Sequence, residues 1–349
     1  MKFARAMKID NTTIKGPAPI AAGCEASLKT CKPTFATIPA LLQQLITVVA
    51  ATLVLAGCSG EEAERQSKKK AVFSFIATAD MRNFAGSEHQ SSEYFFGTCE
   101  AIKAIGKGAF MVSPGDIDPP QQVLETIKKV LGEDYPWYPV VGNHESETPE
   151  DMAWLRNRGM QDIPNLVRRG PENGEETTYS FDFKNAHFVV LNEYYDGESD
   201  TGSNGDITDP LHLWLTQDLE ENTKPLVFVF GHEPILSIPD YHNGRHRHQG
   251  DCLNAHPENS HRFQQLLRKH KVTAYICGHT HNFSHANING LWQLDAGHSR
   301  GIGDTGAPST FLKFLVGKRT CWVDVYRDDA NGGPYSLVQT IELPFLMPR

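Results

Sequence analysis

The sequence of 349 residues lacks the features that mark several common classes of protein. It has no long run of Lys and Arg, and its formal net charge of −9 offers no basic surface for the phosphates that dominate nucleic-acid affinity. It has no Cys-x-x-Cys pair and no His-Glu-x-x-His segment, which argues against a cysteine-rich zinc module and a zinc peptidase. The hydrophobic share of 40% is that of a globular protein. Because of its charge, we do not expect it to bind nucleic acid as a scaffold.

A membrane-spanning helix is also not expected, because the apolar run at residues 45–55 is shorter than the roughly 20 residues that a bilayer requires. This run follows Lys29 and Lys32 and has the outline of a secretory signal. Its ending, Leu55-Ala56-Gly57-Cys58, resembles the bacterial lipobox, in which signal peptidase cuts before a cysteine that receives lipid. The alternative is a buried helix that happens to end in Gly-Cys.

We therefore expect residues 1–57 to be a lipoprotein signal peptide and Cys58 to be the lipidated N-terminus of an exported protein. The lipid would anchor the protein to a bacterial membrane, at the periplasmic face of the outer membrane. The leader is long, so translation from Met7 or a later start remains an alternative. Residues 58–70 are polar and predict a flexible tether, and residues 71–349 predict the folded domain.

Four cysteines belong to the predicted domain, and an exported compartment permits disulfides between them. They are Cys99, Cys252, Cys277 and Cys321. Four cysteines allow three pairings, and the sequence does not choose among these.

Five short apolar runs, rich in Val, Phe and Ile and bounded by Gly or Pro, predict β-strands that end in polar residues. The runs are residues 72–79, 109–115, 137–141, 226–230 and 272–277, and the polar residues after them are Asp80, Asp116, Asn143, His232 and His279. Helical spacing lies between them at residues 122–131, 211–219 and 261–270, which favours an α/β domain. Ligands of such sheets bind outside the carboxyl ends of the strands.

Further strands without intervening helices imply a second sheet. They are expected at residues 179–183, 187–191, 292–294, 311–316, 321–326 and 336–341. Residues 240–258, rich in His, Gly, Asn and Pro, predict a long loop near the site.

The five strand ends carry groups that suit a divalent cation, since imidazole, carboxylate and amide oxygen together fit Zn, Mn or Fe. Their local sequences are Ala79-Asp80-Met81, Gly115-Asp116, Gly142-Asn143-His144-Glu145, Gly231-His232 and Gly278-His279-Thr280-His281. In this order they resemble the five blocks of the calcineurin-like metallophosphoesterases, purple acid phosphatases included. The resemblance covers residues 71 to about 300. It implies the α/β fold of that family, a four-layer α/β/β/α sandwich of two mixed sheets flanked by helices.

The resemblance also implies two metal sites that share Asp116 as a bridging carboxylate. The other ligands of the first site would be Asn143, His232 and His279. The second site would receive Asp80 and His281, and the chain would hold one or two ions of Mn, Fe or Zn. Two cations roughly 3.5 to 4 Å apart activate a shared water and clamp a phosphoryl group. His144 would not bind metal but would stabilise or protonate the leaving-group oxygen.

Two departures from the family pattern concern the second site. Family members commonly carry Asp-x-His in the first block, whereas this chain has Arg82, whose guanidinium stays protonated and cannot bind a metal. In the second block, Pro119 stands where a further Asp or Tyr is usual, and Asp118 comes one position early. Three interpretations compete: Arg82 grips substrate phosphate, its charge replaces the second cation, or a nearby group such as Asn83 or His89 binds the metal instead. We favour the first, because the guanidinium fork matches phosphate oxygens. A simple ion pair with a neighbouring carboxylate is the remaining interpretation.

Two other segments carry His and Arg near the motifs. Residues 241–248 contain three His and two Arg, which would screen an anionic substrate or bind extra metal, unless this is only a solvated loop. His298 and Arg300 follow shortly after the last motif and are candidates for the pocket wall, although ordinary turn chemistry explains them equally.

The sequence thus predicts a hydrolase for small phosphoric esters, working through a metal-activated water. The alternative is a non-catalytic lipoprotein of the same fold that keeps one metal and binds phosphorylated ligands. Arg82 is the feature that motivates this alternative.

Overall fold

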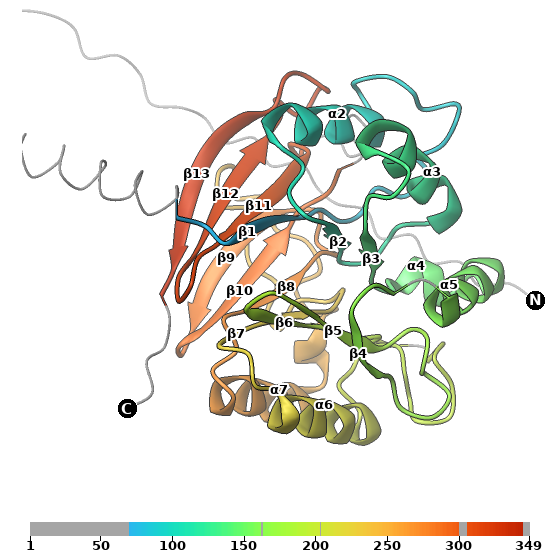
Figure 1. Ribbon diagram of the computed structural model, residues 1–349, viewed down its shortest axis with the longest axis vertical. Coiled ribbons are helices and arrows are strands. Elements are labelled where there is room, and N and C mark those ends of the chain that lie inside the picture. Colours follow the sequence, from blue (N-terminus) through green and yellow to red (C-terminus); the bar gives the residue numbers. More distant parts are fainter. Residues whose placement is uncertain (1–69, 162, 203, 300–305, 345–349) are drawn as a thin grey trace, which may run out of the picture. The chain divides into compact units, whose positions relative to one another are not determined.

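The computed structural model of the protein describes residues 70–161, 163–202, 204–299 and 306–344. Its main feature is a pair of β-sheets packed face to face, with helices on both outer sides (Figure 1). The predicted signal peptide, the lipidation site Cys58 and nearly all of the predicted tether lie outside the described residues, as does Arg300. No helix among the described residues is long and apolar enough to cross a bilayer.

The first sheet has six strands in the order β13-β12-β11-β1-β2-β3. Their bounds are Phe73–Ala77 (β1), Met111–Ser113 (β2), Trp137–Pro139 (β3), Thr310–Val316 (β11), Cys321–Arg327 (β12) and Ser336–Leu343 (β13). The three strands β1, β2 and β3 run parallel, whereas β11 pairs antiparallel with β1 and begins an antiparallel half. The sheet is therefore mixed.

The second sheet has seven strands in the order β4-β5-β6-β7-β8-β10-β9. Their bounds are Leu166–Arg169 (β4), Tyr179–Phe183 (β5), Ala186–Val190 (β6), Leu226–Phe230 (β7), Ala274–Cys277 (β8), Phe283–Ile288 (β9) and Leu291–Ala296 (β10). The central strands β6, β7, β8 and β10 run parallel. Every residue of β7 is buried, because both faces of a central parallel strand are covered, and its sequence Leu-Val-Phe-Val-Phe is accordingly apolar throughout.

Helices cover the outer face of each sheet, α2 and α3 on the first and α6 and α7 on the second (Figure 1). The helices are Phe95–Ile105 (α2), Pro120–Leu131 (α3), Asn143–Ser146 (α4), Pro149–Gln161 (α5), Asp209–Glu221 (α6) and Pro257–Lys269 (α7), and a short 3₁₀ turn, η1, spans Leu253–Ala255. In α3 the apolar side chains recur at Val123, Ile127, Val130 and Leu131, which is the stripe of an amphipathic helix. The helix starts with a proline and stops at Gly132, where φ is 119°.

The space between the sheets is filled mainly by aromatic side chains. Phe75 of β1 stacks on Phe314 of β11 with ring centroids 4.4 Å apart. Across the interface it meets Phe188 and Phe228 of the second sheet edge-on, at 5.3 and 5.4 Å. Truncation of such a buried phenylalanine to alanine costs about 3–5 kcal/mol, so this cluster is a main source of stability.

The four-layer sandwich expected from the sequence is confirmed, but the division of strands between the sheets is not as expected. The strands without intervening helices do not form a sheet of their own: β5, β6 and β10 join the motif strands β7 and β8, while β11, β12 and β13 join β1, β2 and β3. Strand order depends on pairing between distant segments, which local sequence does not encode. The helices α2 and α5 and the strands β4 and β9 were not predicted.

Candidate metal centre

The polar residues predicted at the strand ends come together at one edge of the two sheets. Asp80 follows β1, Asp116 follows β2, His232 follows β7 and His279 follows β8, while Asn143 begins α4 directly after β3. Left-handed backbone occurs at four of the candidate ligands, with φ of 55° at Asp80, 52° at Asp116, 71° at His279 and 56° at His281. Non-glycine residues rarely adopt this conformation, and they concentrate at functional sites.

The first site is a tight set of four ligand atoms. His232 Nε2 lies 3.2 Å from Asn143 Oδ1, 3.3 Å from Asp116 Oδ1 and 3.2 Å from His279 Nδ1. The side chains of His232 and Asp116 are almost completely shielded from solvent. Three nitrogen and oxygen atoms from three different loops therefore surround His232 Nε2 at 3.2 to 3.3 Å.

The hydrogen bonds of the other ring nitrogens show which nitrogen of each imidazole carries the proton. His232 Nδ1 donates to the carbonyl of Pro114 at 2.9 Å, and His279 Nε2 donates to the carbonyl of Asp251 at 2.9 Å. Each neutral ring carries one proton, so His232 Nε2 and His279 Nδ1 present lone pairs to each other and to the oxygens of Asp116 and Asn143. Four lone pairs without a hydrogen between them repel, and a cation removes that repulsion. The residues present therefore fit a divalent metal ion at the first site.

The protonation of the ligands agrees with this fit. Burial lowers the pKa of His232 to about 3 and that of His279 to about 2, so both rings are neutral at physiological pH. Burial raises the pKa of Asp116 to about 6, against the opposing effect of nearby His144. A cation beside Asp116 favours its charged form, and neutral imidazole is the form that binds metals.

Backbone groups hold the first-site loops through a buried carboxylate. Glu145 accepts hydrogen bonds from the backbone N–H of Asp116 at 3.0 Å, Ile117 at 2.8 Å and Gly142 at 2.7 Å. Gly142 packs so closely against Asp116 that a Cβ atom on it would overlap the backbone nitrogen of Asp116. These contacts fix the loop after β2 against the loop after β3.

A second buried carboxylate, Glu193, supports the loop after β7 and was not predicted. Its Oε2 accepts from the backbone N–H of His232 at 2.8 Å and of Glu233 at 2.6 Å. Burial, followed by the neighbouring Glu233 carboxylate, raises the pKa of Glu193 to about 8. The available signal was that Asn192 and Glu193 follow an apolar strand, as the five predicted ligands do.

The second site is less complete. Asp80, Asp116 and His281 offer ligand atoms that lie within 4.8 Å of one another, and all three residues are buried. Asp80 accepts from the backbone N–H of His279 at 3.0 Å, and its Oδ1 lies 3.6 Å from His281 Nε2. Arg247, from the long loop, donates to His281 Nδ1.

The structure also locates the groups considered around Arg82. Arg82 Nε donates to Asp118 Oδ1 at 3.1 Å, and Arg82 lines the pocket with its side chain 25% exposed. His89 meets the stacked rings of Phe84 and Tyr94 edge-on, Asn83 is exposed, and neither residue contributes to the pocket wall. The ion pair with a neighbouring carboxylate is thus present, alongside a position from which Arg82 can still reach a ligand.

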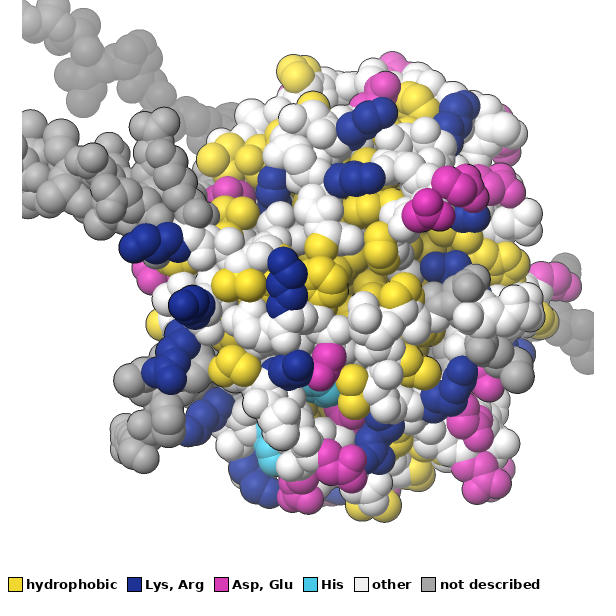
Figure 2. Space-filling model, in the orientation of Figure 1, with side chains coloured by type: hydrophobic (Ala, Val, Ile, Leu, Met, Phe, Trp, Pro, Cys, Tyr) yellow, Lys and Arg dark blue, Asp and Glu magenta, His cyan; other side chains and the backbone are white. Residues whose placement is uncertain are grey.

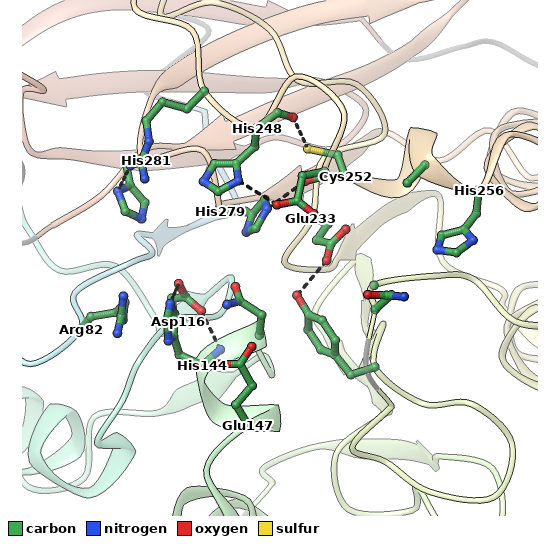
Figure 3. A pocket seen from close by; sticks show the side chains of 17 residues that line it. Arg82, Asp116, His144, Glu147, Glu233, His248, Cys252, His256, His279 and His281 are labelled. Carbon is green, nitrogen blue, oxygen red and sulfur yellow. Dashed lines mark hydrogen bonds and ion pairs between the residues drawn. The ribbon is translucent and has the colours of Figure 1, made fainter. Parts of the chain in front are cut away.

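Four of the candidate ligands, Asp116, Asn143, His279 and His281, line a pocket of about 450 Å³ (Figure 3). His144 lines it, with Nε2 3.7 Å from Asp116 Oδ2 and 30% of its side chain exposed. Arg82, Asp116 and His281 lie along one side, and His256 lies on the opposite side. The sequence did not point to several residues of the wall, which are Glu147, Tyr194, Asn204, Gly205 and Glu233. Other residues of the wall belong to the long loop that was predicted near the site, and these are Asp251, Cys252, Ala255 and His256.

Other predicted features lie at or near the pocket. The long loop is present, with η1 and the start of α7 at its end, and its members Arg247 and His248 reach the pocket. His298 is buried and donates to the carbonyl of Ala307 at 2.9 Å, as ordinary loop chemistry predicts. The four cysteines of the domain are free, buried thiols.

Comparison with known proteins places this site in a family. Residues 75–283, well over half of the chain, match the family model described as calcineurin-like phosphoesterase. The chain belongs to the calcineurin-like phosphoesterase family. Membership implies binding of a divalent metal, without identifying it.

Relatives of this chain include tartrate-resistant acid phosphatase type 5. The rabbit (Oryctolagus cuniculus) protein is 26% identical over 199 residues, which cover 52% of this chain and 56% of the rabbit protein. The pig (Sus scrofa) protein is 23% identical over 273 residues, which cover 71% of this chain and 75% of the pig protein. The chain thus spans little more than half the length of the rabbit protein that it matches.

Solved structures share the fold at lower identity. A structure described as PhoD superposes with a TM-score of 0.55 at 11% identity, covering 78% of this chain and 70% of that one. GAP50, the anchor in the inner membrane complex of Plasmodium, superposes with a TM-score of 0.52 at 15% identity, covering 80% and 90%. Both comparisons concern the fold alone.

Proposed function

We propose that this protein hydrolyses small phosphoric mono- or diesters with a metal ion held by Asp116, Asn143, His232 and His279. The observation that carries the proposal is that four lone pairs converge at the first site. The N–H groups of its two imidazoles donate elsewhere, to backbone carbonyls, and therefore do not occupy the site. A bound divalent ion supplies a Lewis acid that activates water and offsets charge on the phosphoryl oxygens.

The chain's own residues would do the remaining work. His144 stands at the pocket beside Asp116, where it can hold a proton at Nε2 and donate it to the leaving-group oxygen. Arg82 presents its remaining guanidinium N–H groups to the pocket while Nε is held by Asp118, so it can bind a phosphate oxygen in a fixed orientation. Asp80 contributes because both of its carboxylate oxygens accept the backbone N–H of His279, which orients that ligand.

Activity of the purified full-length chain tests this proposal. With added Mn²⁺ it should hydrolyse p-nitrophenyl phosphate or its bis ester, and Asp116→Ala and His279→Ala should abolish turnover. His261→Ala is a matched control, because it removes an exposed imidazole from α7. Undiminished turnover in both ligand variants would sink the assignment.

A non-catalytic phosphate-binding protein is the second candidate, and Arg82 favours it because it stands where a metal ligand is usual. Such a protein would bind inorganic phosphate and retain metal but hydrolyse nothing across a broad panel of esters. Release of phosphate from any ester, lost together with metal in Asp116→Ala, would exclude this candidate.

We also propose that the protein is exported and anchored to a bacterial membrane through lipid on Cys58, at the periplasmic face of the outer membrane. The lipobox-like residues 55–58 support this. Cys58→Ser should prevent incorporation of labelled fatty acid, whereas the buried Cys99→Ser should not. Nucleic acid is not proposed as a partner, in keeping with the mixture of Lys, Arg, Asp and Glu on the face in Figure 2.

A further inference from the structure

The second site differs from the first in what its imidazole faces. His281 Nδ1 is in contact with Arg247 Nη1. A guanidinium nitrogen only donates, so His281 Nδ1 must accept, and the single proton of the neutral ring is then on Nε2, on the side of Asp80.

Neither ring nitrogen of His281 is therefore suited to a metal. Coordination through Nδ1 would require the guanidinium of Arg247 to leave. Coordination through Nε2 would require the proton to move to Nδ1, where it would point at the N–H of Arg247. A metal-bound imidazole normally donates its other N–H to an acceptor, as His232 and His279 do.

Much of the negative charge at the second site is also offset by the protein itself. Among the described residues on this side of the pocket, the carboxylates are Asp80, Asp116 and Asp118, and the guanidiniums of Arg82 and Arg247 offset two of these three charges. Arg82 stands where the family carries an imidazole ligand, and it is paired with Asp118. A further divalent cation would meet two fixed positive charges at close range, which is unfavourable in a buried site.

Arg247 is held in place by the loop that carries it. At the start of the loop, Asp240 forms a buried ion pair with Arg327 of β12, with Oδ2 2.7 Å from Nη2. The hydroxyl of Ser237 donates to the carbonyl of Arg247. After Arg247, the thiol of Cys252 donates to the carbonyl of His248 at 3.2 Å. The guanidinium is thus a positioned group and not part of a freely solvated loop.

We propose that the pocket holds a single metal ion at the first site, and that the guanidiniums of Arg82 and Arg247 replace the second ion and bind the phosphoryl oxygens of the substrate. This inference rests on the proposed phosphoesterase function. Both guanidiniums belong to residues that line the same pocket as three of the first-site ligands, Asp116, Asn143 and His279. A planar guanidinium matches the spacing of phosphate oxygens and needs no exchangeable cofactor.

Metal counting on the purified full-length chain tests the first part of the proposal, that the pocket holds a single metal ion. After saturation with Mn²⁺ and gel filtration, we expect about one ion per chain and the EPR hyperfine pattern of an isolated Mn²⁺. The double variant Arg82→His/Arg247→Ala restores the family's imidazole and frees His281, and it should hold more Mn²⁺ than the parent. Two tightly held ions in the parent, or an exchange-coupled spectrum, would overturn the proposal.

Inhibition by inorganic phosphate tests the second part of the proposal, that the guanidiniums bind phosphoryl oxygens. Arg247→Ala should raise the inhibition constant about 10-fold or more, which is the loss expected for a charge-assisted hydrogen bond. Arg245→Ala is the matched control, since it removes a guanidinium from the same loop that contacts Asn282 and does not line the pocket. Equal inhibition constants for the parent and Arg247→Ala would reject the role of Arg247. Failure of the phosphoesterase proposal would look different, as one bound metal with no hydrolysis.

Discussion

The first metal site and the surroundings of His187 are both built from histidine and aspartate, but their protons are arranged in opposite ways. In the first site, His232 and His279 each donate one N–H to a backbone carbonyl and turn a lone pair toward other acceptors. His187, buried on β6, faces a carboxylate at both ring nitrogens, with Asp182 Oδ1 and Asp218 Oδ2 each 2.8 Å away.

The two environments therefore favour different charge states of the same side chain. Burial dominates at His232 and His279 and lowers their pKa values. Burial also opposes a charge on His187, but the hydrogen bonds and charges of Asp218 and Asp182 outweigh it and raise the pKa of His187. The difference teaches that the acceptors around an imidazole, and not the residue types nearby, separate a metal ligand from a structural ion pair.

Removing an imidazole from the first site should have the largest effect. We expect His232→Ala to lower kcat/KM by at least about 10³-fold, or about 4 kcal/mol, because the metal loses a neutral donor. Steady-state kinetics and metal analysis of the same sample measure this. His187→Gln should keep its metal, and loss of metal in that variant would break the comparison.

Removing the imidazole from the ion-pair cluster should instead reduce stability, by about 3 kcal/mol at acidic pH. His187 has a raised folded-state pKa, so its stabilising charge is fully present below the ordinary value of 6.5 and is lost as pH rises through the folded-state pKa. Denaturant unfolding of the parent and His187→Gln, compared between pH 5.5 and 9, should show a gap that narrows with rising pH. A gap that widens would contradict the assignment.

A smaller effect is expected from the carboxylate behind the first site. Glu145→Gln replaces one acceptor oxygen by an amide that faces backbone N–H groups, so the loops carrying Asp116 and Asn143 should shift. We expect metal affinity to fall about 10- to 100-fold, measured by competition with a chelating dye. Glu150→Gln, an exposed change at the start of α5, is the control and should leave affinity unaltered.

Local patterns in the sequence were sufficient to predict where the motif strands end and which polar residues follow them. The runs before Asp80, Asp116 and His232 are apolar, and the parallel strands of each sheet bring their carboxyl ends together. The helix α5 was not predicted because its sequence has little amphipathic character, although Pro149, Glu150 and Asp151 mark a helix start.

Contacts between distant segments could not be predicted. Glu193 supports His232 through backbone hydrogen bonds, and any buried acidic residue after a strand would look the same in sequence. The meeting of Arg247 with His281 depends on how a long loop folds over the pocket, and no periodicity specifies that path. The sequence identified Arg82 as a departure from the family, but only the structure pairs it with Asp118.

Reversible metal removal tests the central claim most directly. The full-length chain is treated with a chelator, freed of it by gel filtration, and assayed against p-nitrophenyl phosphate or its bis ester during titration with Mn²⁺. We predict that turnover disappears with the metal and returns in proportion to added Mn²⁺, reaching a plateau near one ion per chain. Turnover that persists unchanged in the metal-free chain would contradict the account.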